Sequence, residues 1–332
     1  MKFKMAFAVP LLVVMILSAA VASAQEIPEK GYKCVTEERA RNIVGFLADD
    51  LLEGREAGTR GGYLAAEYII AMFREWGMAP LLDEGYCQQF TAVKNGNNWV
   101  SDADTDISGF LSQGCASRTL KNILVVIPGK EDGVVVVGAH YDHLGIGKAL
   151  DGDSCYNGAD DNASGVSAVM QIAKAIKESG KKPRRTILFA LWDGEEMGLL
   201  GSTYFVKKCP FLSDISAYMN FDMVGRGPLD NPRHLSYLYT AGNPAFADWM
   251  REDTEERGFC FDVKYTPSEN LIGGSDNSPF ARKGIPIVWY HTEGHPDYHR
   301  PSDVAGKIDY EKMVDITRAA FLCTWRLANE EY

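Results

Sequence analysis

Four uninterrupted apolar runs restrict the fold of this chain more than any other feature of its sequence. Runs of this kind are typical of strands that are covered on both faces of a sheet. Between and around them, apolar residues recur at helical spacing, so strands and helices alternate along the chain. This alternation predicts an α/β fold: a three-layer α/β/α arrangement around a central mixed, mainly parallel sheet. The four runs lie within residues 122–128, 133–139, 185–192 and 217–221.

Further predicted elements extend this pattern along most of the chain. Helices are expected at 36–52, 61–76, 164–178, 198–207, 244–257 and 310–328, and strands at 235–239 and 286–290. The 332 residues are 46% hydrophobic, which is enough to form a complete core. Because no Pro/Ser-rich linker or internal repeat divides them, a single folded domain is expected over residues 25–332.

The charge of the chain argues against one class of partner. The formal net charge is −11, and no run rich in lysine and arginine could follow a phosphate backbone. We therefore expect no nucleic-acid binding.

The first 24 residues have the pattern of a secretory signal peptide. Lys2 and Lys4 precede an apolar stretch over 5–21, and a small-x-small sequence ends at Ala24. The alternative is an uncleaved membrane anchor, but the apolar stretch is short and no basic flank follows it. No cysteine follows it either, so nothing indicates a lipid anchor. We expect cleavage near Ala24, export to the periplasm or the medium, and no stable membrane insertion afterwards.

The seven cysteines are scattered, and their pairing stays open. None of them has the spacing of a structural zinc site, and an odd number leaves at least one thiol unpaired within the chain. A catalytic cysteine is not expected, because no histidine is arranged to activate one.

Acidic and histidine residues cluster where the predicted strands end. Ligands at the carboxyl ends of strands face the crevice of an open α/β sheet. Several carboxylates beside buried strands would repel one another unless a cation joins them. Imidazoles mixed with carboxylates suit zinc better than magnesium, and two metals sharing a carboxylate are a known arrangement for hydrolysis. The residues concerned are His140, Asp142, Asp160, Asp161, Glu195, Glu196, Asp222 and His299.

Five segments, taken in order, resemble the co-catalytic two-zinc aminopeptidases, a family of zinc exopeptidases that includes bacterial leucyl aminopeptidases. The resemblance covers nearly all of the chain after the signal peptide and implies the zinc-exopeptidase form of the α/β/α fold. The segments are GAHYDHLG (138–145), NGADDNASG (157–165), LWDGEEMGLLGS (191–202), NFDMVGR (220–226) and YHRPSD (298–303).

The resemblance implies a role for each matching residue. It makes His140 and Asp222 ligands of one zinc, Glu196 and His299 ligands of the other, and Asp161 the bridge between the two zinc ions.

Three further residues take roles around these ligands. By the same resemblance, Asp142 would steady the ligand shell and Glu195 would be the general base. Tyr298, beside the last ligand, would help to stabilise the oxyanion.

Other polar residues near these segments have competing interpretations. For Asp193 and Asp303 a loop or helix-cap role is preferred, and Asp160 could equally cap the helix that follows it. His143 and His234 are interpreted as structural, whereas His291 and His295 are candidates for the pocket wall. Arg226 either contacts substrate or balances local acid. One departure from the family, Asn277 after Ser275 and Asp276, puts the details of the substrate pocket in doubt.

The resemblance leaves more than one activity open. Release of N-terminal residues from peptides with a free N-terminus is expected, with carboxypeptidase or dipeptidase action among relatives of this fold. The alternatives are a glutaminyl-peptide cyclotransferase, which uses one zinc on the same fold, and a non-catalytic binding relative. The cyclases typically have tryptophan before the last histidine ligand, where this chain has Tyr298.

Overall fold

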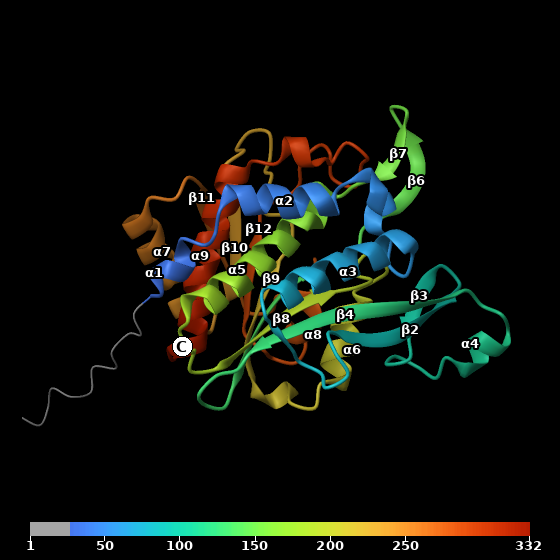
Figure 1. The fold of residues 1–332 in the computed structure, drawn as a ribbon, viewed down its shortest axis with the longest axis horizontal. Helices are drawn as coiled ribbons and strands as arrows, with labels where there is room; N and C mark the ends of the chain where they lie inside the picture. The colour runs from blue at the N-terminus through green and yellow to red at the C-terminus, as the bar shows by residue number, and fades with distance from the viewer. Residues whose placement is uncertain (1–26) are drawn as a thin grey trace, which may run out of the picture.

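The computed structural model describes residues 27–332, and a ten-stranded mixed sheet runs through it (Figure 1). The predicted signal peptide, residues 1–24, lies outside the described residues. The strand order is β11-β10-β12-β9-β5-β8-β4-β2-β3, and β1 pairs with β4. The strands are β1 (Ala79–Pro80), β2 (Cys87–Asn95), β3 (Asn98–Ser101), β4 (Ser117–Ile127), β5 (Val134–His140), β8 (Thr186–Trp192), β9 (Ile215–Phe221), β10 (His234–Thr240), β11 (Asp262–Ser268) and β12 (Ile287–His291).

Parallel pairing is concentrated in the middle of this sheet. Strands β12, β9, β5 and β8 lie parallel to one another in that order, whereas β10 against β12 and the pairings of β4 with β8 and β2 are antiparallel. The prediction of a mixed α/β sheet is therefore confirmed. Because parallel strands end at the same edge, the carboxyl ends of β5, β8 and β9 come together there.

Helices cover the sheet on both faces, which completes the three predicted layers. In β5, Val135 and Val137 pack into the cluster beneath α5 and α9, while Val136 packs with Phe205 of α6 and Phe280 of α8 on the other face. The helices are α1 (Glu29–Tyr32), α2 (Glu37–Leu47), α3 (Arg60–Glu75), α4 (Ser108–Ser112), α5 (Gly165–Ser179), α6 (Leu200–Lys208), α7 (Ala245–Arg257), α8 (Asn277–Ala281) and α9 (Tyr310–Asn329).

The predicted helix over 36–52 is shorter in the structure. Thr36 caps it by accepting the backbone N–H of Arg39, and α2 ends at Leu47. A separate short turn follows over Asp50–Arg55, in which Gly54 has a left-handed backbone that cannot continue an α-helix. This break brings the side chain of Arg55 beneath the site described below.

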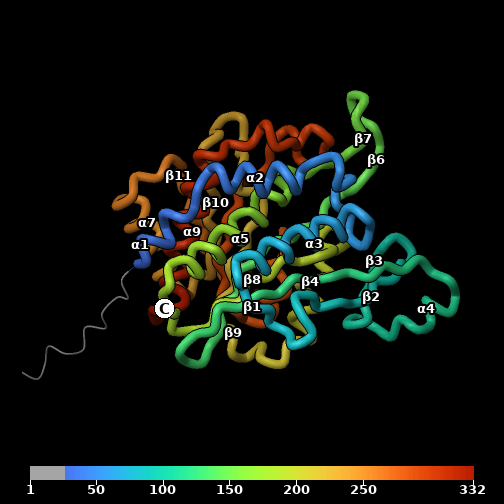
Figure 2. The backbone as a smooth tube through the Cα atoms, viewed as in Figure 1, coloured from blue at the N-terminus to red at the C-terminus, as the bar shows by residue number. Residues whose placement is uncertain are grey.

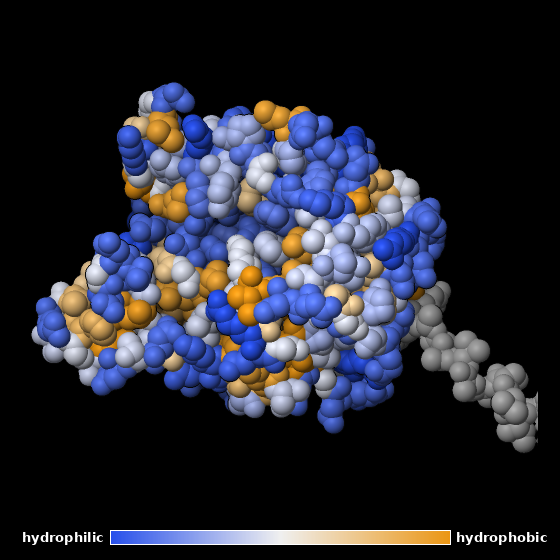
Figure 3. All heavy atoms as spheres, turned by 180° about the vertical axis from the view of Figure 1, so that it is seen from behind, coloured by the Kyte–Doolittle hydropathy of each residue, from blue (hydrophilic) through white to orange (hydrophobic). Residues whose placement is uncertain are grey.

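Two regions that the apolar pattern did not predict project from the layers. Strands β2 and β3 with α4 form an arm, and β6 (Gly145–Leu150) pairs with β7 (Asp153–Tyr156) in a separate hairpin (Figure 2). On the face seen from behind, which is mostly hydrophilic, the arm carries part of the apolar surface (Figure 3). Both regions lie partly in solvent, so their sequences lack uninterrupted apolar runs.

Two further properties of the described chain bear on the expectations above. All seven cysteines lie within residues 27–332, and each is a free thiol there. Over the same residues, no helix combines the length and the apolar character that crossing a bilayer requires.

Candidate metal centre

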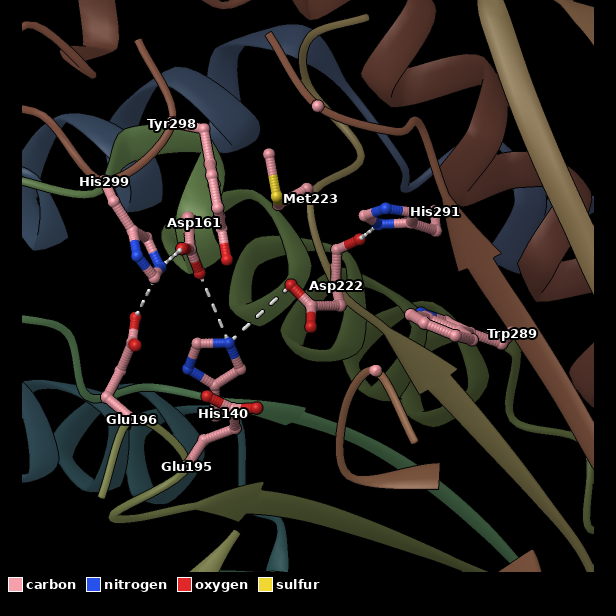
Figure 4. Close-up of a pocket in the computed structure, with 12 residues that line it drawn as sticks. His140, Asp161, Glu195, Glu196, Asp222, Met223, Trp289, His291, Tyr298 and His299 are labelled. Atoms are coloured by element: carbon pink, nitrogen blue, oxygen red, sulfur yellow. Dashed lines mark hydrogen bonds and ion pairs between the residues drawn. The ribbon is translucent and has the colours of Figure 1, made fainter. Parts of the chain in front are cut away.

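Most of the predicted site residues line one pocket of about 280 Å³ at the carboxyl ends of the central strands (Figure 4). Asp142, by contrast, is buried beneath the pocket rather than lining it. The predicted residues in the pocket wall are His140, Asp161, Glu195, Glu196, Asp222, Tyr298 and His299.

One side of the pocket takes its donors from the ends of two adjacent parallel strands. His140 is the last residue of β5, and Asp222 directly follows β9. The His140 Nε2 atom lies 3.4 Å from Asp161 Oδ1 and 3.7 Å from Asp222 Oδ1. We call these three residues the His140 side. Their donor atoms all lie within 4.8 Å of one another, close enough to hold one metal ion.

The other side takes its donors from loops. His299 Nε2 lies 3.1 Å from Asp161 Oδ2 and 3.6 Å from Glu196 Oε1. His143, which the sequence led us to treat as structural, joins them: its Nδ1 atom is 2.8 Å from Glu196 Oε1 and 3.8 Å from Asp161 Oδ2. We call Glu196, His299, His143 and Asp161 the Glu196 side. The only sequence signal for His143 is its place three residues after His140.

Asp161 offers one carboxylate oxygen to each side, and its backbone is held from below. It lies in an irregular turn, Ala159–Ser164, and is 3% exposed. Asp303 Oδ2 accepts the backbone N–H groups of both Asp160 and Asp161, at 3.0 and 3.1 Å. The buried Arg55 guanidinium donates to the carbonyl oxygens of Gly158 and Asp161. These contacts fix the carboxylate that both sides share.

Asp142 connects the two sides through the backbone. Its carboxylate accepts the N–H groups of Glu195 and Glu196, at 3.0 and 3.3 Å, and Oδ1 lies 3.7 Å from His140 Nδ1. Burial is the main cause that raises the pKa of Asp142 to about 7. Asp142 thus positions the loop that carries Glu195 and Glu196.

The charges of the site are strongly interdependent. Burial alone would raise the pKa of Asp161, but His143, His140 and His299 hold it well below its usual value. Burial would lower the pKa of His299, yet Asp161 and Glu196 raise it to about 10. The carboxylates therefore stay ionised only beside positive charge, which a divalent cation would supply.

Glu195 differs from the ligand candidates in its surroundings. Desolvation raises its pKa well above the ordinary value, His140 opposes this, and the buried carboxylates of Asp276 and Asp222 add to the rise. It also lines the pocket, where a substrate could reach it. A carboxyl group with a raised pKa beside a metal site is suited to exchanging protons near neutral pH.

The donor set fits zinc. It combines imidazole nitrogens with carboxylate oxygens in two groups that share Asp161, whereas magnesium and calcium prefer shells of oxygen alone. The protein holds these buried donors close together with no competing lysine or arginine among the residues that line the pocket.

The remaining pocket wall is formed largely by β12 and the loop that carries His299. His291, a predicted wall residue, lines the pocket, and its Nδ1 atom lies 2.6 Å from the carbonyl oxygen of Asp222. Trp289 stands two residues before it on the same strand and lines the pocket too. Tyr298 is 46% exposed, and its ring stacks on His299, with centroids 3.8 Å apart.

Two other expectations, for His295 and Asp160, are wrong. His295 does not line the pocket but is buried with its Nε2 atom 3.2 Å from Asp160 Oδ2. Asp160 accepts the N–H of Gly225 and does not cap α5, where Asn162 instead accepts the N–H of Gly165. These two interpretations were wrong because both residues face partners distant in sequence.

The three other polar candidates have structural partners. Asp193 has the expected loop position, directly after β8, but caps no helix: buried beside β4, it accepts the N–H of Lys121. His234 lies 3.2 Å from Glu293, in keeping with a structural role. Arg226 forms an ion pair with Asp297 at 2.9 Å, so it balances local acid.

Comparison with known proteins places the chain in a family. Residues 122–323 match the model of peptidase family M28, so the chain belongs to that family. Among curated relatives, a probable leucine aminopeptidase from Arthroderma otae is 26% identical over 284 residues, which cover 80% of this chain and 74% of that protein. Several other curated relatives are longer proteins, of which this chain spans 26% to 38%.

Solved structures share the fold. BSAP, a zinc aminopeptidase from Bacillus subtilis, superposes with a TM-score of 0.67 at 17% identity, covering 90% of this chain and 97% of that one. Porphyromonas gingivalis glutaminyl cyclase superposes with a TM-score of 0.62 at 17% identity, covering 87% of this chain and 98% of that one. The fold is thus common to peptidases and cyclases, and the site has to distinguish between them.

Proposed function

We propose that this chain is an exported aminopeptidase that removes N-terminal residues from peptides with the help of two zinc ions. The observation that carries the proposal is the shared position of Asp161, whose two oxygens face separate donor groups. Membership of peptidase family M28 supports hydrolysis of peptide bonds. The leucine aminopeptidase among the curated relatives supports action at the N-terminus.

Each side of the pocket would hold one zinc ion. His140, Asp222 and Asp161 would bind the first, and Glu196, His299 and Asp161 the second. Bound zinc lowers the pKa of a coordinated water toward neutrality and polarises a carbonyl group.

The protein's own groups would then move the protons. Glu195 accepts the proton of the attacking water and returns it to the leaving amine, for which its raised pKa is suited. Asp142 holds the backbone of Glu195 during this transfer. The Tyr298 hydroxyl, whose pKa burial and nearby carboxylates keep above its usual value, stays protonated and can donate to the oxyanion.

The acidic pocket also favours a substrate with a free N-terminus. The residues that line it include four carboxylates, and no lysine or arginine. A positively charged α-amine is attracted to such a pocket, whereas the carboxylate at a peptide's C-terminus is repelled by it. This favours aminopeptidase over carboxypeptidase action.

The alternative activity is glutaminyl cyclisation, which the fold of the Porphyromonas gingivalis cyclase brings into consideration. A cyclase has to keep water from its substrate amide, whereas two metals that share a carboxylate hold water at the reacting carbon. The second donor group around Glu196, and Tyr298 in the place where cyclases have tryptophan, therefore favour hydrolysis.

A glutamine-initiated peptide with no N-terminal block separates the two activities. We expect mass spectrometry to show loss of the whole glutamine residue. Loss of ammonia without shortening of the chain would contradict the proposal. A matched peptide with an acetylated N-terminus controls for endopeptidase action and should stay intact.

The proposed export concerns residues that the structure does not describe. It is supported by the charge and hydropathy pattern of residues 1–24. N-terminal sequencing of the protein from the periplasm or the medium should give a chain that starts at Gln25. A chain that retains the first 24 residues would contradict cleavage.

A further inference from the structure

The Glu196 side of the pocket contains one imidazole more than the two-zinc pattern requires. His143 follows the strand end that carries His140, and its ring is fully buried. Its Nδ1 atom approaches Glu196 Oε1 more closely than His299 does, at 2.8 Å against 3.6 Å. The two-zinc pattern of the sequence gives this buried imidazole no role, although it lies beside a candidate ligand.

The surroundings of His143 fix its ring in place. Its backbone N–H donates to the carbonyl oxygen of Arg55 at 3.2 Å, and the Arg55 side chain in turn holds the carbonyl of Asp161. Gly158 packs directly against the ring: a Cβ atom on it would lie 2.5 Å from His143 Cδ2. Its φ of +56° also lies in the left-handed region, which favours glycine. The chain therefore holds His143 and Asp161 in one rigid arrangement.

On the Glu196 side, the donor atoms of His143, Asp161 and Glu196 all lie within 4.8 Å of one another, close enough to hold one metal ion. Zinc bonds of about 2.0–2.2 Å place tetrahedral ligand atoms about 3.3–3.6 Å apart. The distances from the nitrogen atoms of His143 and His299 to the oxygens of Glu196 and Asp161 are 2.8, 3.1, 3.6 and 3.8 Å, so shifts of up to about 0.5 Å would bring all four into that range. On the His140 side the corresponding distances are 3.4 and 3.7 Å, and only three residues contribute.

The second nitrogen of the His143 ring is consistent with ligation. Nε2 is buried and has no hydrogen-bond partner within residues 27–332. The hydrogen-bonding contact of the ring is therefore made through Nδ1, which faces Glu196 Oε1.

We propose that His143 is a fourth protein ligand on the Glu196 side, so that the two halves of the metal centre are unequal. This inference rests on the proposed two-zinc function. The Glu196 side becomes a closed site, whereas the His140 side keeps a position free, as catalytic zinc sites do. The closed site fills first and releases its ion last. Activity then follows occupancy of the His140 side.

A hydrogen bond from His143 to Glu196, without ligation, is the competing explanation, and two substitutions separate it from the proposal. In His143→Asn the amide nitrogen can still donate to Glu196 but binds zinc poorly. In His143→Cys the thiolate restores a zinc ligand with a bond of about 2.3 Å but cannot replace the imidazole donor. His234→Gln, which removes a buried histidine outside the pocket, is the matched control.

The experiment is a zinc titration of the metal-free full-length mature protein, followed by absorption spectra after cobalt substitution. We expect His143→Asn to weaken the tighter site by about 100-fold or more, beyond what loss of a supporting hydrogen bond costs. We expect His143→Cys to bind both ions and to show a cobalt–thiolate charge-transfer band. Wild-type affinities in His143→Asn, or no such band in His143→Cys, would overturn the inference. His234→Gln should match the wild type throughout.

X-ray absorption on the unaltered zinc-loaded protein gives an answer that does not depend on how the variants fold. The proposal predicts three imidazoles for two zinc ions, from His140, His143 and His299, and two imidazoles would overturn it. If the protein binds two zinc ions and hydrolyses peptides but shows only two imidazoles, this inference alone fails. If it takes up no zinc, the proposed function fails as well.

Discussion

The two sides of the metal centre are built by different means. On the His140 side, the donors stand at the ends of β5 and β9, whose parallel pairing alone brings His140 and Asp222 together. On the Glu196 side, Glu196 and His299 come from loops, and buried carboxylates such as Asp142 hold the loop backbone. Sheet topology thus positions the His140 side of the centre, and hydrogen bonds to the loop backbone position the Glu196 side.

The largest effect is expected where the two sides meet. Asp161→Ala removes an oxygen from each donor group, so both ions should be lost and peptide hydrolysis should fall to background. Elemental analysis after gel filtration measures the bound zinc, and circular dichroism checks that the variant folds. Retention of one ion at wild-type affinity would show that the sides do not share this carboxylate.

Removing the general base should slow turnover but leave both sides of the metal centre intact. Glu195→Gln keeps a similar shape but cannot accept a proton, so kcat should fall by about 10²- to 10⁴-fold while two zinc ions stay bound. Steady-state kinetics together with metal analysis test this. A rate near that of the wild type would mean that another group is the base.

A pair of substitutions compares the two sides directly. Asp222→Ala leaves only His140 and Asp161 on its side, whereas His299→Ala leaves Asp161, Glu196 and His143 on the other. We therefore expect Asp222→Ala to cost more zinc affinity at its own site than His299→Ala does. Zinc titrations of both variants measure the difference, and equal losses would contradict the unequal arrangement.

A smaller effect is expected at the rim of the pocket. Tyr298→Phe removes a hydroxyl that we place at the oxyanion, so kcat should fall while KM changes little. Because Tyr298 is 46% exposed, the decrease should be below the loss of about 10²-fold typical of a well-shielded donor. An effect confined to KM would make Tyr298 a substrate-binding residue.

The smallest effect on catalysis is expected at Asp193, where stability should change instead. Burial raises its pKa from 3.8 to about 6, so the folded protein holds this proton more tightly than the unfolded chain. Between about pH 4 and 6 the folded state binds more protons, and this residue therefore makes stability fall as pH rises.

Asp193→Asn keeps an acceptor for the Lys121 N–H and removes that pH dependence. Relative to the wild type, the variant should gain stability across the same pH window. Urea unfolding of both metal-free proteins from pH 4 to 7 measures the difference, and parallel pH curves would contradict the assignment.

The buried layers of the fold were predictable because burial leaves a local pattern. The runs at 122–128, 133–139, 185–192 and 217–221 each became a central strand, since a strand covered on both faces has apolar residues throughout. The arm from β2 to α4 and the β6–β7 hairpin have mixed polar sequences, so no run distinguished them from loops. Their pairing depends on partners elsewhere in the chain.

The gathering of the candidate ligands at one place was predictable for a similar reason, because each stands at a strand end or in a loop motif. The supporting residues were not. Asp160 and His295 pair with each other across 135 positions of the chain, and Asp303 reaches the backbone of Asp161 across 142. His143 differs from an ordinary buried histidine only in the atoms that surround it.

Stepwise addition of zinc to the metal-free mature protein, with release of the N-terminal residue from an unblocked peptide measured at each step, tests for two zinc sites of unequal affinity. We predict that the first equivalent binds with little activity and that activity rises with the second. Full activity after one equivalent, or binding of only one ion, would contradict a two-zinc peptidase with unequal sides.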